Sequence, residues 1–318
     1  MKEPRKGALF VTLLLAFITV AVVAAYFFVA TPREKGIPQI SKANPSLANT
    51  TSAGAHPQTQ TAATPPAAEQ NPEIKQRRYP KTGGDLREEA PLSHLTPGTG
   101  RLAIIVDDMG SSVSEARTLS AIGVPLTFSV IPGLHSYREV ALFAESKNIE
   151  IMIHIPMQSR GWPGRRLESN GLLLSMGNAE LRERVSGFLR DMPKAVGANN
   201  HMGSEFTEHE EKMRSVLETL KSKNLFYVDS VTSMQTIGLR LARELGIKAG
   251  RRHVFLDNEQ ERDYILGQLG QAVKLAKKTG YAIAICHPHP ETITTLASEL
   301  PGLSGQGITL VPVSQLVR

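Results

Sequence analysis

Residues 102–108, LAIIVDD, are a run of apolar side chains that ends in two adjacent carboxylates. Continuous apolar runs of this length, rich in Ile and Val, are typical of strands buried on both faces of a parallel sheet. Similar runs recur along the rest of the chain, at residues 125–132, 149–157, 196–203, 225–230, 248–257, 281–288 and 308–314. The chain from residue 101 onward therefore reads as a series of buried parallel strands.

Amphipathic helical patterns occupy the gaps between these runs, for example at residues 136–147, 179–190, 208–223, 233–245 and 260–278. Alternation of strand and helix signals is the pattern of an α/β fold. Seven or eight such units in roughly 220 residues favour an irregular (β/α) barrel of seven or eight parallel strands over an open doubly wound sheet.

The N-terminal segment, residues 1–30, predicts a membrane anchor. Residues 7–32 carry no charge, which is a length sufficient to cross a hydrocarbon core as a helix. Lys2, Arg5 and Lys6 precede it, so the positive-inside rule places the rest of the chain across the membrane. A cleaved signal peptide is the alternative, but its apolar run is usually shorter.

Residues 31–97 are rich in Pro, Ala and Thr and lack apolar periodicity, which predicts a disordered linker before the domain at residues 98–318. The formal net charge is +6 and is spread over the chain. Nucleic-acid binding usually needs a concentrated basic surface, so no nucleic-acid partner is expected. The single cysteine, Cys286, excludes an internal disulfide and a Cys-based zinc cluster, and it reads as a small buried core residue.

Ionisable side chains fall at or near the ends of most of the predicted strands: Asp107, Asp108, His154, His201, Asp229, Asp257 and His287. Each one alone has an ordinary explanation, because such an Asp is often a helix cap and a lone His is often a core residue. In a parallel barrel, however, the carboxyl ends of the strands converge on one face. Burying this many unpaired polar groups together is costly, so their joint placement predicts a functional site.

The adjacent pair Asp107 and Asp108 suggests two different roles: one carboxylate binds a metal and the other accepts a proton. Asp and His together are common zinc ligands, and a metal with an open position activates water and polarises a carbonyl oxygen. This chemistry predicts hydrolysis of an amide or ester. Asp257 can bind substrate or cap the following helix, and the cap is the favoured reading. Trp162 lies in a Gly-rich loop, where it can stack on a sugar or face solvent.

Six segments, IIVDDMG, ESKNIEIMIHIPMQ, NNHMGSEFT, FYVDSVTS, HVFLDN and AICHPHPET, occur in this order over residues 101–318. Together they resemble the divergent polysaccharide deacetylases, relatives of metal-dependent carbohydrate esterases with a β/α barrel. The resemblance implies that Asp107 is the catalytic base, that Asp108 and His154 bind the metal, most simply Zn²⁺, and that His287 is the general acid. It further implies that Asp229 orients His287.

Two positions depart from the pattern of the wider superfamily. Its second metal histidine lies four residues after the first, where this chain has Gln158, a poor zinc ligand. His201 is the predicted replacement, which gives Asp108, His154 and His201 as the ligand set. The superfamily also has an arginine that supports the base, and here Asn199 and Asn200 are the residues available nearby.

The sequence leaves three functions open. The first is a single-pass protein of the bacterial inner membrane whose periplasmic domain removes acetyl groups from an envelope polysaccharide or peptidoglycan-like glycan. The second is a non-catalytic envelope protein that keeps the barrel to bind glycan or a protein. The third, a metal-independent glycosidase with two carboxylates across the scissile bond, is disfavoured by the adjacent aspartates and separate histidines.

Overall fold

Nine strands form one sheet in the computed structural model, which describes residues 98–318. They are β1 (Gly100–Met109), β2 (Thr127–Val130), β3 (Glu150–Met157), β4 (Gly197–Met202), β5 (Phe226–Asp229), β6 (Ala249–Arg251), β7 (Val254–Phe255), β8 (Tyr281–Cys286) and β9 (Ile308–Leu310). The predicted membrane anchor and linker lie outside the described residues. Within residues 98–318, none of the helices combines the length and the apolar character needed to span a bilayer.

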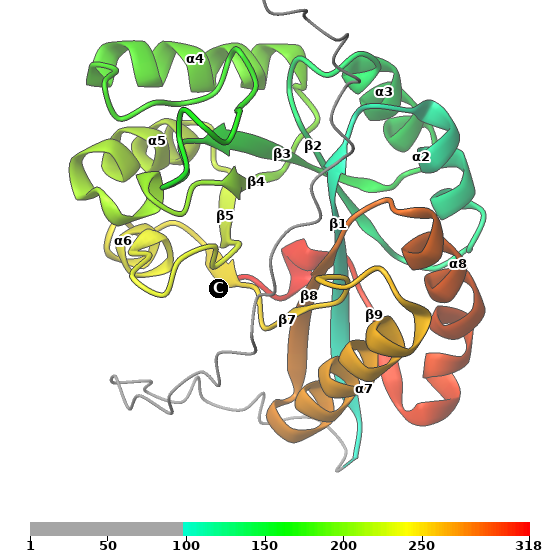
Figure 1. The fold of residues 1–318 in the computed structure, drawn as a ribbon. Helices are drawn as coiled ribbons and strands as arrows, with labels where there is room; N and C mark the ends of the chain where they lie inside the picture. The colour runs from blue at the N-terminus through cyan, green and yellow to red at the C-terminus, as the bar shows by residue number, and fades with distance from the viewer. Residues whose placement is uncertain (1–97) are drawn as a thin grey trace, which may run out of the picture. The chain divides into compact units, whose positions relative to one another are not determined.

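The strands run parallel in the order β6-β5-β4-β3-β2-β1-β8-β7, and β9 also pairs with β1. The eight strands of this path curl into a half-barrel (Figure 1). The predicted parallel α/β fold is confirmed, whereas the expected barrel does not close between β6 and β7. Residues 252 and 253 cross that gap and bond elsewhere: Arg252 N donates to Asp229 O and His253 N donates to Ile283 O.

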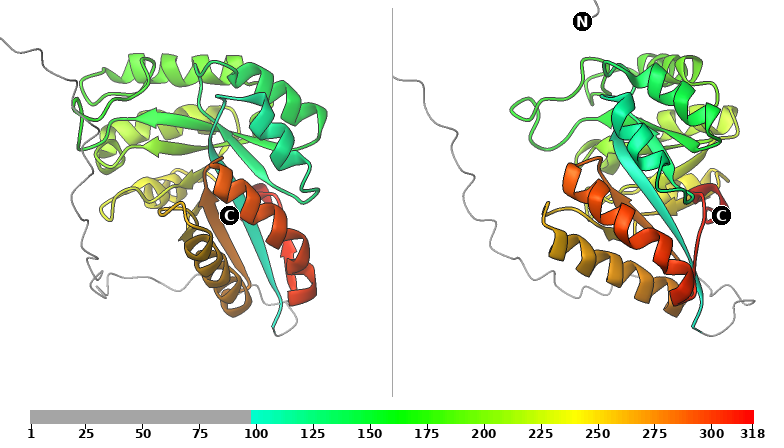
Figure 2. Two further views of the ribbon diagram at one scale, coloured as in Figure 1. Left: turned by 45° about the vertical axis from the view of Figure 1, so that its right-hand side comes forward. Right: turned by 90° about the vertical axis from the view of Figure 1, so that its right-hand side faces the viewer.

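The helices lie on the outer side of the curled sheet (Figures 1 and 2). They are α2 (Val113–Ser120), α3 (Tyr137–Ser146), α4 (Asn178–Asp191), α5 (Glu210–Ser222), α6 (Gly238–Glu244), α7 (Arg262–Thr279) and α8 (Pro290–Glu299). Local sequence sets their ends. The Ser112 side chain caps α2 by accepting from Ser114 N, and Gly280, with φ 93°, ends α7 in the left-handed conformation that glycine favours.

Alternate residues of β1, and likewise of β8, belong to two different cores. In β1, Leu102 and Ile104 pack outward against the helices, while Ala103 and Ile105 face the inside of the half-barrel. The inside is filled by apolar residues of the segment 311–317: Val311, Val313, Leu316 and Val317. This alternation determines which residues at the strand ends reach the inner face.

Candidate metal centre

Asp107 and Asp108 both face the site because β1 is irregular at its end. Asp107 continues the inward set of Ala103 and Ile105, so a regular strand would turn Asp108 outward. Instead Asp108 has φ 56°, and the register between β1 and β2 shifts between Val106 and Met109. Asp tolerates this left-handed conformation better than most residues do. The bulge thereby presents two adjacent carboxylates to one face of the sheet.

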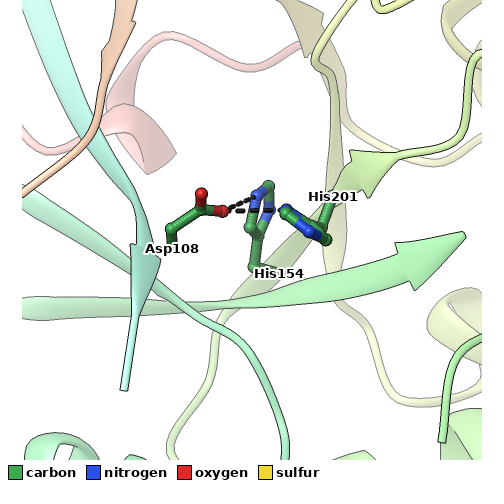
Figure 3. A group of neighbouring side chains, drawn as sticks. All are labelled: Asp108, His154 and His201. Carbon is green, nitrogen blue, oxygen red and sulfur yellow. Dashed lines mark ion pairs between the residues drawn. The ribbon is translucent and has the colours of Figure 1, made fainter. Parts of the chain in front are cut away.

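His154 on β3 and His201 on β4 meet the carboxylate of Asp108 (Figure 3). His154 Nε2 lies 3.2 Å and His201 Nδ1 lies 2.8 Å from Asp108 Oδ1. The two imidazole rings are 5.0 Å apart between centroids. One ligand atom from each of the three residues lies within 4.8 Å of the others. The structure thus brings together the three residues that the sequence predicted as metal ligands.

The donor set fits a divalent cation. Ligand atoms about 2.0–2.2 Å from a tetrahedral zinc ion are about 3.3 Å apart, close to the spacings around Asp108. Asp108 Oδ1 is buried and has no hydrogen-bond partner of good geometry among the described residues, although two ring nitrogens lie near it. The nitrogens therefore approach this oxygen without forming directed hydrogen bonds, which is the arrangement expected of ligands that share one ion.

Asn199 holds both His154 and Asp107. Its Oδ1 lies 2.7 Å from His154 Nδ1 and accepts from Ser129 Oγ, and its Nδ2 donates to Asp107 Oδ1 at 2.8 Å. Because Oδ1 is an acceptor, the imidazole carries its proton on Nδ1 and leaves the Nε2 lone pair free for a cation. The amide thus fixes the orientation of a candidate ligand and of the candidate base together.

Replacing Asn199 with alanine is expected to weaken Zn²⁺ binding by about 10–100-fold, because the tautomer and orientation of His154 are no longer held. Zinc titration against a chelating dye measures this effect. Asn200→Ala is the matched control, because Asn200 bonds to Tyr227 Oη and Ser230 N on the outer side of β4. Equal zinc affinities of the two variants would show that Asn199 does not position the site.

Asp107 is placed to accept a proton. The residue is 3% exposed, and burial raises the pKa of its carboxyl, offset in part by the charges of His154 and His287 and by the Asn199 hydrogen bond. A carboxylate with a raised pKa is a stronger base than one in water. Asp107 Oδ2 lies 3.5 Å from His154 Nε2, so this candidate base borders the candidate ligand set.

His287 is oriented by Asp257, which corrects the sequence-based pairing with Asp229. His287 Nδ1 lies 3.1 Å from Asp257 Oδ1, and His287 N donates to Asp257 Oδ2. Burial alone would lower the pKa of His287, but Asp257 and the nearby aspartates raise it to about 9. These carboxylates therefore favour the protonated imidazole, and its Nε2 lies 3.8 Å from Asp108 Oδ2.

The side chain of Asp229 points to the outer side of the sheet, as does that of Tyr227. Tyr227 packs in the outer core while Phe226 and Val228 pack in the inner one, so Asp229 faces α6. Its oxygens accept from Val231 N, Thr236 Oγ1 and Leu239 N. It stabilises the β5–α6 connection, whereas Asp257, predicted as a helix cap, supplies the carboxylate that meets His287.

Gln158 does not take the place of a metal ligand. Its Nε2 donates to Glu205 Oε2, and its Oε1 accepts from Leu174 N, so the side chain joins two loops.

The other residues that the sequence singles out lie outside the candidate metal centre. Cys286 is buried in the outer core, as predicted. Trp162 is 38% exposed on the loop between β3 and α4. His289, with Asp257 and His287, belongs to a second group of side chains close enough to hold an ion.

Comparison with known proteins identifies the family. Residues 104–317 match the family model described as divergent polysaccharide deacetylase. The chain belongs to this family. The relatives include an uncharacterized protein YibQ of Escherichia coli, 36% identical and covering 69% of this chain and 68% of the relative. An uncharacterized protein of Haemophilus influenzae is 34% identical and covers 69% of this chain and 77% of the relative.

The fold is also shared with a solved structure. The uncharacterized protein ATU2773 of Agrobacterium tumefaciens superposes with a TM-score of 0.64 at 24% identity, over 70% of this chain and 92% of that one. This likeness concerns the fold alone.

Proposed function

We propose that this divergent polysaccharide deacetylase is a metal-dependent hydrolase that removes acetyl groups from an N-acetylated or O-acetylated envelope glycan. The observation that carries the proposal is the convergence of Asp108, His154 and His201 on one point beside the buried carboxylate of Asp107. Family membership supports the substrate class, a polysaccharide. The proposed resident ion is Zn²⁺, because one carboxylate and two imidazoles leave a coordination position open.

The reaction follows from what each side chain can do. Asp108, His154 and His201 would hold the ion, which when bound supplies an electrophile for the acetyl carbonyl and lowers the pKa of water. Asp107 removes a proton from the attacking water. His287, protonated and held by Asp257, gives a proton to the departing amine or alcohol. Water adds to the acyl carbon, the carbon–nitrogen or carbon–oxygen bond breaks, and acetate leaves.

The proposed location follows from the N-terminal segment. A single-pass anchor at residues 1–30 and a linker at residues 31–97 would place the domain on the outer side of the bacterial inner membrane, in the periplasm. A peptidoglycan-like glycan near that membrane would then be within reach. No nucleic-acid partner is proposed.

Acetate release tests the activity. We expect the zinc-loaded protein to release acetate from N-acetylated chitooligosaccharides or peptidoglycan fragments, and Asp107→Asn to lose about 100-fold or more of that rate while still binding zinc. Glu183→Gln is the control, because Glu183 is an exposed partner of Arg190 on α4. Stoichiometric zinc without acetate release from any acetylated glycan would favour the non-catalytic glycan-binding alternative.

A further inference from the structure

We propose that Glu168 is a positioning residue that holds His201 in its ligand orientation, an inference that rests on the proposed metal site. Glu168 lies in the loop between β3 and α4, far in sequence from β4. Its Oε2 is buried, has no hydrogen-bond partner in the part of the chain that the structure describes, and lies 3.7 Å from His201 Nε2. On the other side of the same ring, His201 Nδ1 faces Asp108.

The loop that carries Glu168 is attached to its surroundings on both sides of that residue. Gln158, at the start of the loop, donates to Glu205 in the β4–α5 connection and accepts from Leu174 N near the end of the loop. After Glu168, Asn170 Nδ2 donates to Pro132 O at 2.8 Å. Arg184 Nη1 also donates to Gly171 O at 3.2 Å. These contacts hold the loop against the connections that follow β2 and β4 and against α4. The backbone that places the Glu168 carboxylate beside His201 is therefore held in position.

The chemistry of the pair follows from the two ring nitrogens. A carboxylate behind Nε2 favours the tautomer with its proton on Nε2, which leaves the Nδ1 lone pair directed toward Asp108. The negative charge also makes the imidazole a stronger ligand. Asn199 supports His154 in the same way, because its neutral amide oxygen contacts the ring nitrogen that does not face Asp108. Each histidine of the set thus has its own supporting side chain.

This arrangement gives a physical account of Gln158, which stands where the wider superfamily has a second histidine ligand. A glutamine joins the loop to the β4–α5 connection through a donor and an acceptor. The ligand then comes from His201 on the neighbouring strand, and the loop that Gln158 secures supplies Glu168 behind it. One loop thus carries both Gln158, which secures it, and Glu168, which lies beside His201.

Zinc affinity and histidine tautomer test the proposal together, on the full chain. We expect Glu168→Ala to weaken Zn²⁺ binding by about 10–100-fold, as for other residues that orient metal-bound histidines. Glu168→Gln, which keeps an acceptor oxygen but not the charge, is expected to lose less. In ¹⁵N-histidine NMR of the zinc form, Glu168→Ala should shift the Nε2 signal of His201 and leave that of His154 unchanged. Glu183→Gln should change neither measurement.

Two results would overturn the proposal: zinc affinity within twofold of the wild type in both Glu168 variants, or a loss of affinity without a selective change at His201. Glu168→Gln keeps the size of the side chain and provides the measurement if the alanine variant does not fold. The outcome is separable from that of the metal site itself. Failure of the wild-type chain to bind zinc would contradict the proposed function, whereas the Glu168 variants are compared with a wild type that binds it.

Discussion

Replacing His154 with alanine is expected to abolish stoichiometric Zn²⁺ binding, with a loss of affinity of more than about 100-fold. Residues that merely orient a metal-bound histidine contribute about 10–100-fold, and a ligand contributes more. The loss should be large because His154 is 2% exposed and its neighbours leave no obvious replacement donor on β3. Zinc content of the purified variant, together with a titration against a competing chelator, measures the effect.

His135→Ala is the matched control for this experiment, because His135 is an exposed histidine in the connection between β2 and α3. It should retain the zinc content and the affinity of the wild type. Thermal unfolding of both variants in the absence of metal separates loss of the site from loss of the fold. Full zinc content in folded His154→Ala protein would show that the ligand assignment is incorrect.

Introducing a carboxylate inside the half-barrel is expected to unfold much of the domain. Val313 is fully buried in the inner core with Ile105 and Ile283. Val313→Asp removes that apolar contact and buries an unpaired charge, at a cost of about 3–5 kcal/mol or more. Because domains are stable by only about 5–15 kcal/mol, urea unfolding followed by circular dichroism should show a large fall in the midpoint.

Val196→Asp makes the same chemical change at an exposed position, since Val196 is 43% exposed just before β4. Its effect on the free energy of unfolding should stay within about 0.5 kcal/mol. If the two aspartate variants unfold at the same urea concentration, the segment 311–317 does not form the inner core that we describe.

The sequence predicted the strands well where apolar runs are long and bounded by helical patterns. The run at residues 281–288 corresponds to β8, and the predicted helix at residues 179–190 corresponds to α4. The run at residues 248–257 predicts one strand, but in the structure it divides into β6 and β7. Two very short strands with different neighbours resemble one weak strand in sequence, and this division leaves the barrel open.

Site residues were harder to assign where both faces of a strand are apolar. In β5 and β7 the alternation between inner and outer positions is hidden, because each face is covered by hydrophobic side chains. Asp229 and Asp257 therefore look equivalent in sequence, although one faces α6 and the other faces His287. Glu168 does not lie at the end of a predicted strand, so the pattern that points to the other site residues does not include it. Its contact with His201 depends on the path of a long loop, which local sequence patterns do not specify.

X-ray diffraction at the zinc absorption edge, from crystals of this protein grown with Zn²⁺, tests the central claim most directly. We expect one strong anomalous peak about 2.0–2.2 Å from Asp108, His154 and His201 together. A peak held instead by the second group, Asp257, His287 and His289, or no peak near either group, would contradict the account.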